Sequence, residues 1–265
     1  MKHSIFTVTM KSFSVDEAIK SLSSAGFDGV EWRVHEEYHL SLDLLAKQAE
    51  QIGRRCRDSG LEVVSLATYL KIDDEERIES VAEAAARMGS PCFRVWLPSY
   101  ERGAHYRELY VHSLENLATI EEQLAGFPVR ALVEIHMDTI APSSSLITRL
   151  VEDLDPKRIG VIFDPGNMVY EGRINWRLSL EILGEYLSHV HVKNAAWKRD
   201  DNGRWRCGSE TLWDGQVDWR EVISDLKAVG YDGYLSLEDF SELPEHEKIV
   251  KDLAYLKKVE EDEAS

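Results

Sequence analysis

Four ionisable side chains stand at the ends of apolar, β-rich runs, and all four are of types that bind metal ions. Glu134 ends the run ALVE, Asp164 ends GVIFD, His191 lies within HVHVK and Glu238 ends GYLSLE. An unpaired carboxylate in such surroundings costs several kcal/mol to bury. A single divalent cation would offset that cost, because three carboxylate oxygens and one imidazole suit Mn²⁺, Mg²⁺, Co²⁺, Zn²⁺ or Fe²⁺. The donor set favours Mn²⁺ or Mg²⁺ only slightly.

The elements that must position these residues are short strand-like runs that alternate with longer helical patterns. This alternation is typical of βα units around a parallel sheet. Eight such units in 265 residues predict one (β/α)₈ TIM barrel, an α/β fold, as a single domain over residues 1–265. A doubly wound sheet is less favoured, because no GxGxxG follows the first strand. The expected strands are residues 4–10, 29–33, 62–68, 92–97, 131–137, 160–164, 189–193 and 233–239.

The helices expected between these strands carry their own boundary signals. In SVDEAIKSLSSAG, Ser14 is placed to cap a helix and Gly26 to end it. Longer helical patterns cover roughly residues 40–59 and 103–126. Active sites of such barrels lie at the carboxyl ends of the strands, so the last four strands are expected to bring the four ionisable residues to one half of the rim.

Composition and charge exclude several other classes of protein. The formal net charge of −17 opposes binding to nucleic acid, and no window is apolar enough for a membrane span. The three cysteines are scattered, and the first residues lack the pattern of a secretory signal. We therefore expect a cytoplasmic enzyme whose partner is a small molecule, with neither a membrane nor a nucleic acid partner.

Four segments of the sequence resemble those of a known family. The segments ALVEIHMDT, GVIFDPGNMVYEG, HVHVKNA and GQVDWREVISDLKAVGYDGYLSLEDF, in this order, are similar to the sugar phosphate isomerase/epimerase superfamily of xylose isomerase-like TIM barrels. The resemblance implies that Glu134, Asp164, His191 and Glu238 bind one divalent metal. It also implies that Glu134 and Glu238 flank the substrate as a catalytic pair.

The function implied is a divalent-metal-dependent isomerase or epimerase of a sugar, sugar derivative or sugar phosphate. Proton transfer would pass through a metal-bound enediolate, since coordination stabilises the charge that develops next to the carbonyl. A glutamate that binds metal through one oxygen keeps the other as a base. The alternative on the same site is a lyase that dehydrates a keto-polyol or keto-glycoside, because the enediolate can also expel a β-hydroxyl.

Further polar and aromatic residues near the strand ends are candidates for substrate binding. Lys193 follows His191 by one pleat and is expected to bind a substrate oxyanion, whereas His189 is expected to support the site from below. Glu31 and Arg33 share one face of their strand, where they would contact hydroxyls or pair with each other. The complete set of candidates is Lys193, Asn167, His136, Glu31, Arg33, Arg94, Trp96 and Glu171.

The chain departs from the family pattern at three positions. In the ketose 3-epimerase branch a histidine stands where this chain has Asn167, and an arginine where it has Trp197. Many members also carry an aspartate at the position of Asn194, and its loss is expected to affect how Lys193 is oriented. These departures put the epimerisation of free ketohexoses in doubt.

Two further classes of protein are less favoured by the sequence. An endonuclease IV-like phosphodiester hydrolase shares the barrel but needs more histidines at the strand ends and a less acidic protein. A non-catalytic binding barrel is opposed by the complete set of four ligands. Members of the family often form homodimers or homotetramers, so the resemblance allows either state.

Overall fold

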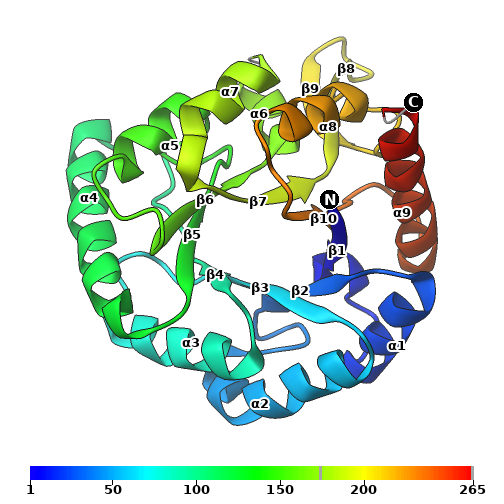
Figure 1. The fold of residues 1–265 in the computed structure, drawn as a ribbon. Coiled ribbons are helices and arrows are strands. Elements are labelled where there is room, and N and C mark those ends of the chain that lie inside the picture. Colours follow the sequence, from blue (N-terminus) through cyan, green and yellow to red (C-terminus); the bar gives the residue numbers. More distant parts are fainter. Residues whose placement is uncertain (173–174, 264–265) are drawn as a thin grey trace.

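Eight parallel strands close into a barrel within residues 1–172 and 175–263, which the computed structural model describes (Figure 1). The order around the barrel is β1-β10-β7-β6-β5-β4-β3-β2. The predicted TIM-barrel fold is therefore confirmed. The strands are β1 Lys2–Phe6, β2 Gly29–Val34, β3 Glu62–Thr68, β4 Cys92–Arg94, β5 Arg130–Glu134, β6 Ile159–Phe163, β7 Leu187–Val192 and β10 Tyr234–Leu237.

Helices surround the barrel as an outer layer (Figure 1). Ser14 and Glu17 form the reciprocal capping box of the first helix, and Gly26 ends it in the left-handed conformation at φ +85°, as the sequence predicts. Among the described residues, no helix is both long and apolar enough to cross a membrane. The helices are α1 Val15–Ala25, α2 Leu42–Asp58, α3 Glu75–Met88, α4 Tyr106–Gln123, α5 Ser144–Val151, α6 Pro165–Glu171, α7 Trp176–Leu183, α8 Trp219–Ala228 and α9 Glu245–Asp262.

The alternation of residues along β7 separates the hydrophobic core from the interior of the barrel. Val190 and Val192 are fully buried in the apolar cluster that joins the strands to the helices. His189 and His191, which have the opposite direction in the pleat, bond instead to Glu31 of β2 inside the barrel. In HVHV, the valines therefore form the apolar face of the strand and the histidines form its polar face.

The first strand is shorter than the sequence indicates. A strand over residues 4–10 was expected, but β1 covers Lys2–Phe6 and the chain then turns into a 3₁₀ helix, Thr7–Met10. The hydroxyl of Thr9 donates to the carbonyl oxygen of Phe6 and closes this turn. The β-branched composition of the segment fits a strand, but this side-chain bond stabilises the turn instead.

A β-hairpin follows β7, in a segment where the sequence predicted no strand. Its strands are β8 Asn194–Arg199 and β9 Trp205–Glu210, which pair antiparallel. The side chain of Asp200 accepts from the backbone N–H groups of Asn202 and Arg204, and Gly203 takes φ +74° in the turn. The hairpin lies beside α6, outside the ring of strands (Figure 1).

The buried side chain of Asp252 on α9 leads us to predict how the stability of the protein depends on pH. Burial, together with the nearby carboxylate of Asp239, raises its pKa from 3.8 to about 8. The folded protein therefore holds this proton more tightly than the unfolded chain, and stability falls as the pH rises from 3.8 towards about 8. Asp252→Asn should raise the free energy of unfolding at about pH 9 by at least ~1.4 kcal/mol, the equivalent of one pKa unit. Urea denaturation at about pH 5 should show a much smaller gain; equal gains at both pH values would contradict this assignment.

Candidate metal centre

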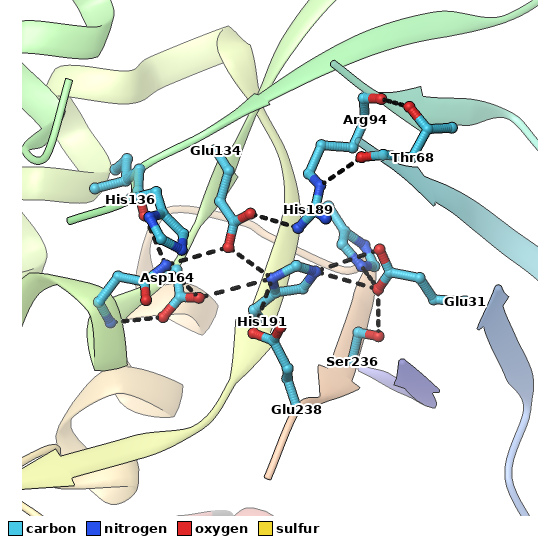
Figure 2. Close-up of polar contacts among 12 residues, drawn as sticks. Glu31, Thr68, Arg94, Glu134, His136, Asp164, His189, His191, Ser236 and Glu238 are labelled. Carbon is cyan, nitrogen blue, oxygen red and sulfur yellow. Dashed lines mark hydrogen bonds and ion pairs between the residues drawn. The ribbon is translucent and has the colours of Figure 1, made fainter. Parts of the chain in front are cut away.

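Four strands bring the predicted ligands together at the carboxyl end of the barrel (Figure 2). Glu134 ends β5, Asp164 follows β6 and caps α6, His191 lies on β7, and Glu238 follows β10. One ligand atom from each of the four lies within 4.8 Å of the others. All four residues are buried, between 0% and 4% exposed. Parallel strands in a closed barrel account for this convergence, because their carboxyl ends meet at one rim.

His191 occupies the centre of the cluster. Its Nδ1 lies 3.1 Å from Oε1 of Glu134, 3.6 Å from Oδ2 of Asp164 and 3.4 Å from Oε2 of Glu238. The ring of Phe6 stacks on the imidazole, with centroids 5.7 Å apart and planes 15° apart. One nitrogen of the ring therefore faces all three carboxylates.

Two buried cations neutralise part of the carboxylate charge. The Arg94 guanidinium lies 2.7 Å from Glu134, and the Lys193 ammonium lies 2.8 Å from Asp164 and 2.7 Å from Glu238. Burial opposes ionisation of Glu134, but Arg94 and His191 outweigh it and hold the pKa of that carboxyl well below its usual range.

The other members of the cluster respond differently to the same surroundings. Burial raises the pKa of Glu238, and the attraction of Lys193 only partly offsets it. Burial opposes a charge on Lys193 as well, yet Asp164 and Glu238 raise the pKa of its ammonium group. The acidic neighbours, Glu31 first among them, likewise overcome burial and raise the pKa of His191 well above its usual value. The cluster thus attracts positive charge strongly.

The donor set fits a divalent cation. Ligand atoms of three carboxylates and one imidazole lie within 4.8 Å of one another, and Arg94 and Lys193 together balance two of the three negative charges. An incoming cation would compete with Lys193 for Asp164 and Glu238. The oxygens that face His191, Oδ2 of Asp164 and Oε2 of Glu238, are also the ones that bond the ammonium, so the ion would take the place of Lys193 at these atoms.

A cavity of about 190 Å³ opens directly on the cluster. Five of the predicted substrate-binding residues line it: Arg94, Trp96, His136, Asn167 and Lys193. The other three residues predicted to bind substrate are not among the described residues that line the cavity: Glu31, Arg33 and Glu171.

Asn167 lines the cavity and forms hydrogen bonds to two of the candidate metal ligands. Its side-chain amide donates to Oε1 of Glu134 at 3.2 Å and to Oδ2 of Asp164 at 3.0 Å. Its Oδ1 is buried without a hydrogen-bond partner among the described residues. This oxygen can accept a bond from a substrate hydroxyl while the amide group holds the two carboxylates.

The aromatic wall of the cavity comes partly from residues that the sequence analysis did not identify. Trp96 packs edge-on against His136, with ring centroids 4.8 Å apart, as part of this wall. Tyr69, Tyr170 and Phe240 complete it. Tyr69 directly follows β3, so its place at a strand end was the one signal that could have revealed it.

The three predicted residues outside the cavity lining have other surroundings. Glu31 is fully buried beneath His191 and bonds to His189, which has the supporting position expected of it. The Arg33 guanidinium lies over the ring of Tyr38, 3.8 Å from its centroid. Glu171 is exposed at the end of α6.

The hairpin and the loop after it place Trp197 and Trp213 outside the cavity lining. Trp197 is 41% exposed, and its indole N–H donates to the carbonyl oxygen of Val169. Trp213 is 42% exposed and packs against Tyr255 of α9. Among the tryptophans of the described residues, Trp96 is the one that lines the cavity.

Asn194 holds the base of the hairpin and does not contact Lys193 through its side chain. Its amide nitrogen donates to the carbonyl oxygens of Leu212 and Val217, and its Oδ1 accepts from the N–H of Val217. An added Cβ on Gly215 would lie 2.1 Å from this side chain. An aspartate here could not donate to either carbonyl, which gives a physical reason for the amide.

The closed parallel barrel and the ligand cluster at the carboxyl ends of its strands define a TIM barrel with a candidate metal centre. The family model described as "Xylose isomerase-like TIM barrel" matches residues 19–259. The chain therefore belongs to the xylose isomerase-like TIM barrel family, as the resemblance indicated.

Several proteins are similar to this chain in sequence, over alignments of different lengths. An inosose dehydratase of Clostridium perfringens is 28% identical over an alignment of 257 positions, and the alignment covers 86% of this chain and 83% of that protein. An uncharacterized protein of Methanocaldococcus jannaschii is 30% identical over 255 residues, 90% of this chain and 84% of that protein. With an inosose dehydratase of Geobacillus thermodenitrificans, the match spans 116 residues at 28% identity, 39% of this chain and 38% of that protein.

Solved structures share the fold at lower sequence identity. The probable 3-DHS dehydratase AsbF of Bacillus anthracis has a TM-score of 0.78 at 20% identity, covering 96% of this chain and 99% of that chain. The 3-keto-D-glucoside 4-epimerase YcjR of E. coli has a TM-score of 0.76 at 20% identity, covering 97% and 99%. The IOLI protein, solved with a bound zinc atom, has a TM-score of 0.78 at 15% identity, covering 99% and 98%. At these identities the likeness concerns the fold.

Asn194→Asp should destabilise the protein. The substitution places a carboxylate against two carbonyl oxygens and removes two buried donors, at a cost of about 1–3 kcal/mol. Urea denaturation measures the effect, and Asn202→Asp in the exposed hairpin turn is the control. An Asn194→Asp variant as stable as the control would show that the amide is not required.

Proposed function

We propose that this protein is a divalent-metal-dependent enzyme that removes a proton next to the carbonyl group of a small polyhydroxylated ketone. The observation that carries the proposal is the buried ligand cluster of three carboxylates and one imidazole, with a cavity directly above it. Glu134, Asp164, His191 and Glu238 would hold the ion. When bound, a dication polarises the carbonyl and stabilises the negative charge that develops as the proton leaves.

Glu134 and Glu238 are the proposed acid/base pair. Both line the cavity, and they come from strands that are separated in the ring by β6 and β7. They can therefore reach a bound ketone from two directions. One carboxylate takes the proton, and the C–H electron pair forms the enediolate. The other glutamate then returns a proton to carbon, which yields an isomer or epimer.

Dehydration is the second candidate reaction, and the position of Lys193 favours it. Its ammonium lies in the cavity 2.7 Å from Glu238, where an acid could protonate a departing hydroxyl group. The enediolate electrons then form a C=C bond as the β C–O bond breaks, and one water leaves. Relatives named as inosose dehydratase and a structural neighbour named as a probable dehydratase support this fate, whereas the named epimerase supports the first.

The cavity residues also suggest how a polyol would be oriented. Asn167 presents its free Oδ1, Arg94 keeps a buried Nη2 without a partner among the described residues, and Trp96 offers an apolar face. These groups suit a ring or chain that carries both hydroxyl groups and C–H edges.

The test is a screen in D₂O of the chelated and metal-reconstituted protein with ketoses, sugar phosphates, inososes and keto-glycosides. Metal-dependent uptake of deuterium next to the carbonyl, read by NMR, is the expected result. Conserved product mass indicates isomerisation or epimerisation, and loss of one water indicates dehydration. Isomerisation that conserves mass without any deuterium uptake would contradict proton transfer to solvent-exchanging carboxylates and favour a hydride shift. Cleavage of an abasic oligonucleotide would instead indicate a phosphodiester hydrolase.

Glu238→Gln should reduce turnover of any substrate so identified by at least about 10²-fold, because it removes a proton-transfer group that is also a metal ligand. Steady-state kinetics at saturating metal provide the measurement. Glu83→Gln, on the exposed face of α3, removes a carboxylate remote from the cavity and should leave the rate unchanged. A normal rate for Glu238→Gln would remove this residue from the mechanism.

A further inference from the structure

Glu31 is a fully buried carboxylate that lies beneath the candidate ligands. It belongs to β2, on the other side of β1 and β10 from His191 on β7. Its side chain is 0% exposed and crosses the barrel interior to reach His191 (Figure 2). A buried carboxylate is costly unless donors surround it, so its partners should explain its presence.

Three side chains surround this carboxylate. Oε2 accepts from the Ser236 hydroxyl at 2.7 Å and lies 3.0 Å from Nε2 of His189 and 3.2 Å from Nε2 of His191. Oε1 lies 3.3 Å from the same nitrogen of His191. Ser236 and His189 hold the carboxylate from two other directions, so its orientation relative to His191 is fixed.

The two nitrogens of His191 therefore face different partners. Nδ1 faces Glu134, Asp164 and Glu238, whereas Nε2 faces Glu31. A carboxylate at Nε2 needs a proton on that nitrogen, because an unprotonated nitrogen would place lone pair against lone pair. Nδ1 faces carboxylates as well, so it also carries a proton until a dication replaces that proton; the neutral ring would then keep its Nε2 proton towards Glu31 and offer the Nδ1 lone pair to the ion.

We propose that Glu31 is a positioning residue that fixes the tautomer and direction of His191, so that Nδ1 is the nitrogen offered to the metal. The inference rests on the metal centre of the proposed function. It replaces the expectation that Glu31 contacts substrate hydroxyls. A carboxylate behind a ligating histidine also raises the basicity of the ring, and loss of such partners typically weakens metal binding about 10–100-fold.

The same residues could be interpreted as a second metal site. Glu31, His189 and His191 each offer a ligand atom within 4.8 Å of the others. An ion there would need Nε2 of His191 without its proton, while Nδ1 served the first ion. The Ser236 hydroxyl already donates to Glu31, which favours the hydrogen-bonded arrangement. The number of ions bound per chain separates the two interpretations.

The experiment measures metal binding, not turnover. Chelated wild-type and Glu31→Gln proteins are titrated with Mn²⁺, Zn²⁺ and Co²⁺ against a chromophoric chelator, and bound ions are counted by elemental analysis. We expect one ion per chain in both proteins and about 10–100-fold weaker binding in Glu31→Gln. The visible spectrum of bound Co²⁺ should also change, since a glutamine offers one acceptor oxygen to three donors and can turn its NH₂ group towards His191.

Two serines on neighbouring strands provide matched controls. Ser236→Ala removes one donor to Glu31 and should weaken metal binding by a smaller factor. Ser4→Ala, paired in register with Ser236, removes a buried hydroxyl that has no hydrogen-bond partner among the described residues, and should not affect metal binding. If Glu31→Gln fails to fold, as judged by circular dichroism of the chelated protein, the comparison of Ser236→Ala with Ser4→Ala still decides the matter.

Several outcomes would overturn the inference. Two ions per wild-type chain and one in Glu31→Gln would make Glu31 a ligand. If Glu31→Gln binds metal with unchanged affinity and leaves the Co²⁺ spectrum unchanged, Glu31 is only a space-filling group. The same conclusion follows if Glu31→Gln does not fold and Ser236→Ala and Ser4→Ala bind metal with equal affinity. If the predicted loss of affinity is found but no ketone exchanges its proton, the proposed function fails and the role of Glu31 stands.

Discussion

The burial of carboxylates inside a closed barrel is the constraint on which the rest of this structure depends. Glu31, Glu134, Asp164 and Glu238 are all at most 4% exposed, in an interior where unpaired charge is expensive. Arg94 and Lys193 offset part of that charge from the rim, and His189 and Ser236 donate to Glu31 from below. The arrangement stabilises positive charge at the point where the cavity meets the cluster.

The barrel makes this arrangement possible because each strand has an apolar and a polar direction. On β7, Val190 and Val192 pack towards the helices, while His189 and His191 reach Glu31 in the interior. The cluster therefore has two levels. The upper level faces the cavity with ligand atoms and substrate contacts, and the lower level, around Glu31, orients the imidazole of the upper one.

Much of this could be predicted from the sequence, for reasons that are local. Alternating βα patterns predict the barrel, and the ligand residues stand at strand ends, so the fold fixes which residues converge at the rim. Ser14 and Gly26 mark α1 because capping depends on neighbouring residues. The β8–β9 hairpin also had a local signal that was missed, the Asn202-Gly203 pair between two short runs.

The remainder depends on contacts between distant parts of the chain. Glu31 and His189 are 158 positions apart, and nothing near Glu31 in the sequence shows that it meets a histidine and not Arg33. The purpose of Asn194 is likewise visible only when the loop that contains Leu212 and Val217 is in place. Strand periodicity gives the face of each residue, whereas barrel closure selects its partner across the interior.

The most direct test of the central claim is an anomalous diffraction measurement on crystals of the Mn²⁺-loaded protein. We expect one strong anomalous peak per chain at the manganese edge, within bonding distance of Glu134, Asp164, Glu238 and Nδ1 of His191. A peak bonded to Nε2 of His191 and to Glu31, or no peak with Lys193 still bridging Asp164 and Glu238, would contradict it.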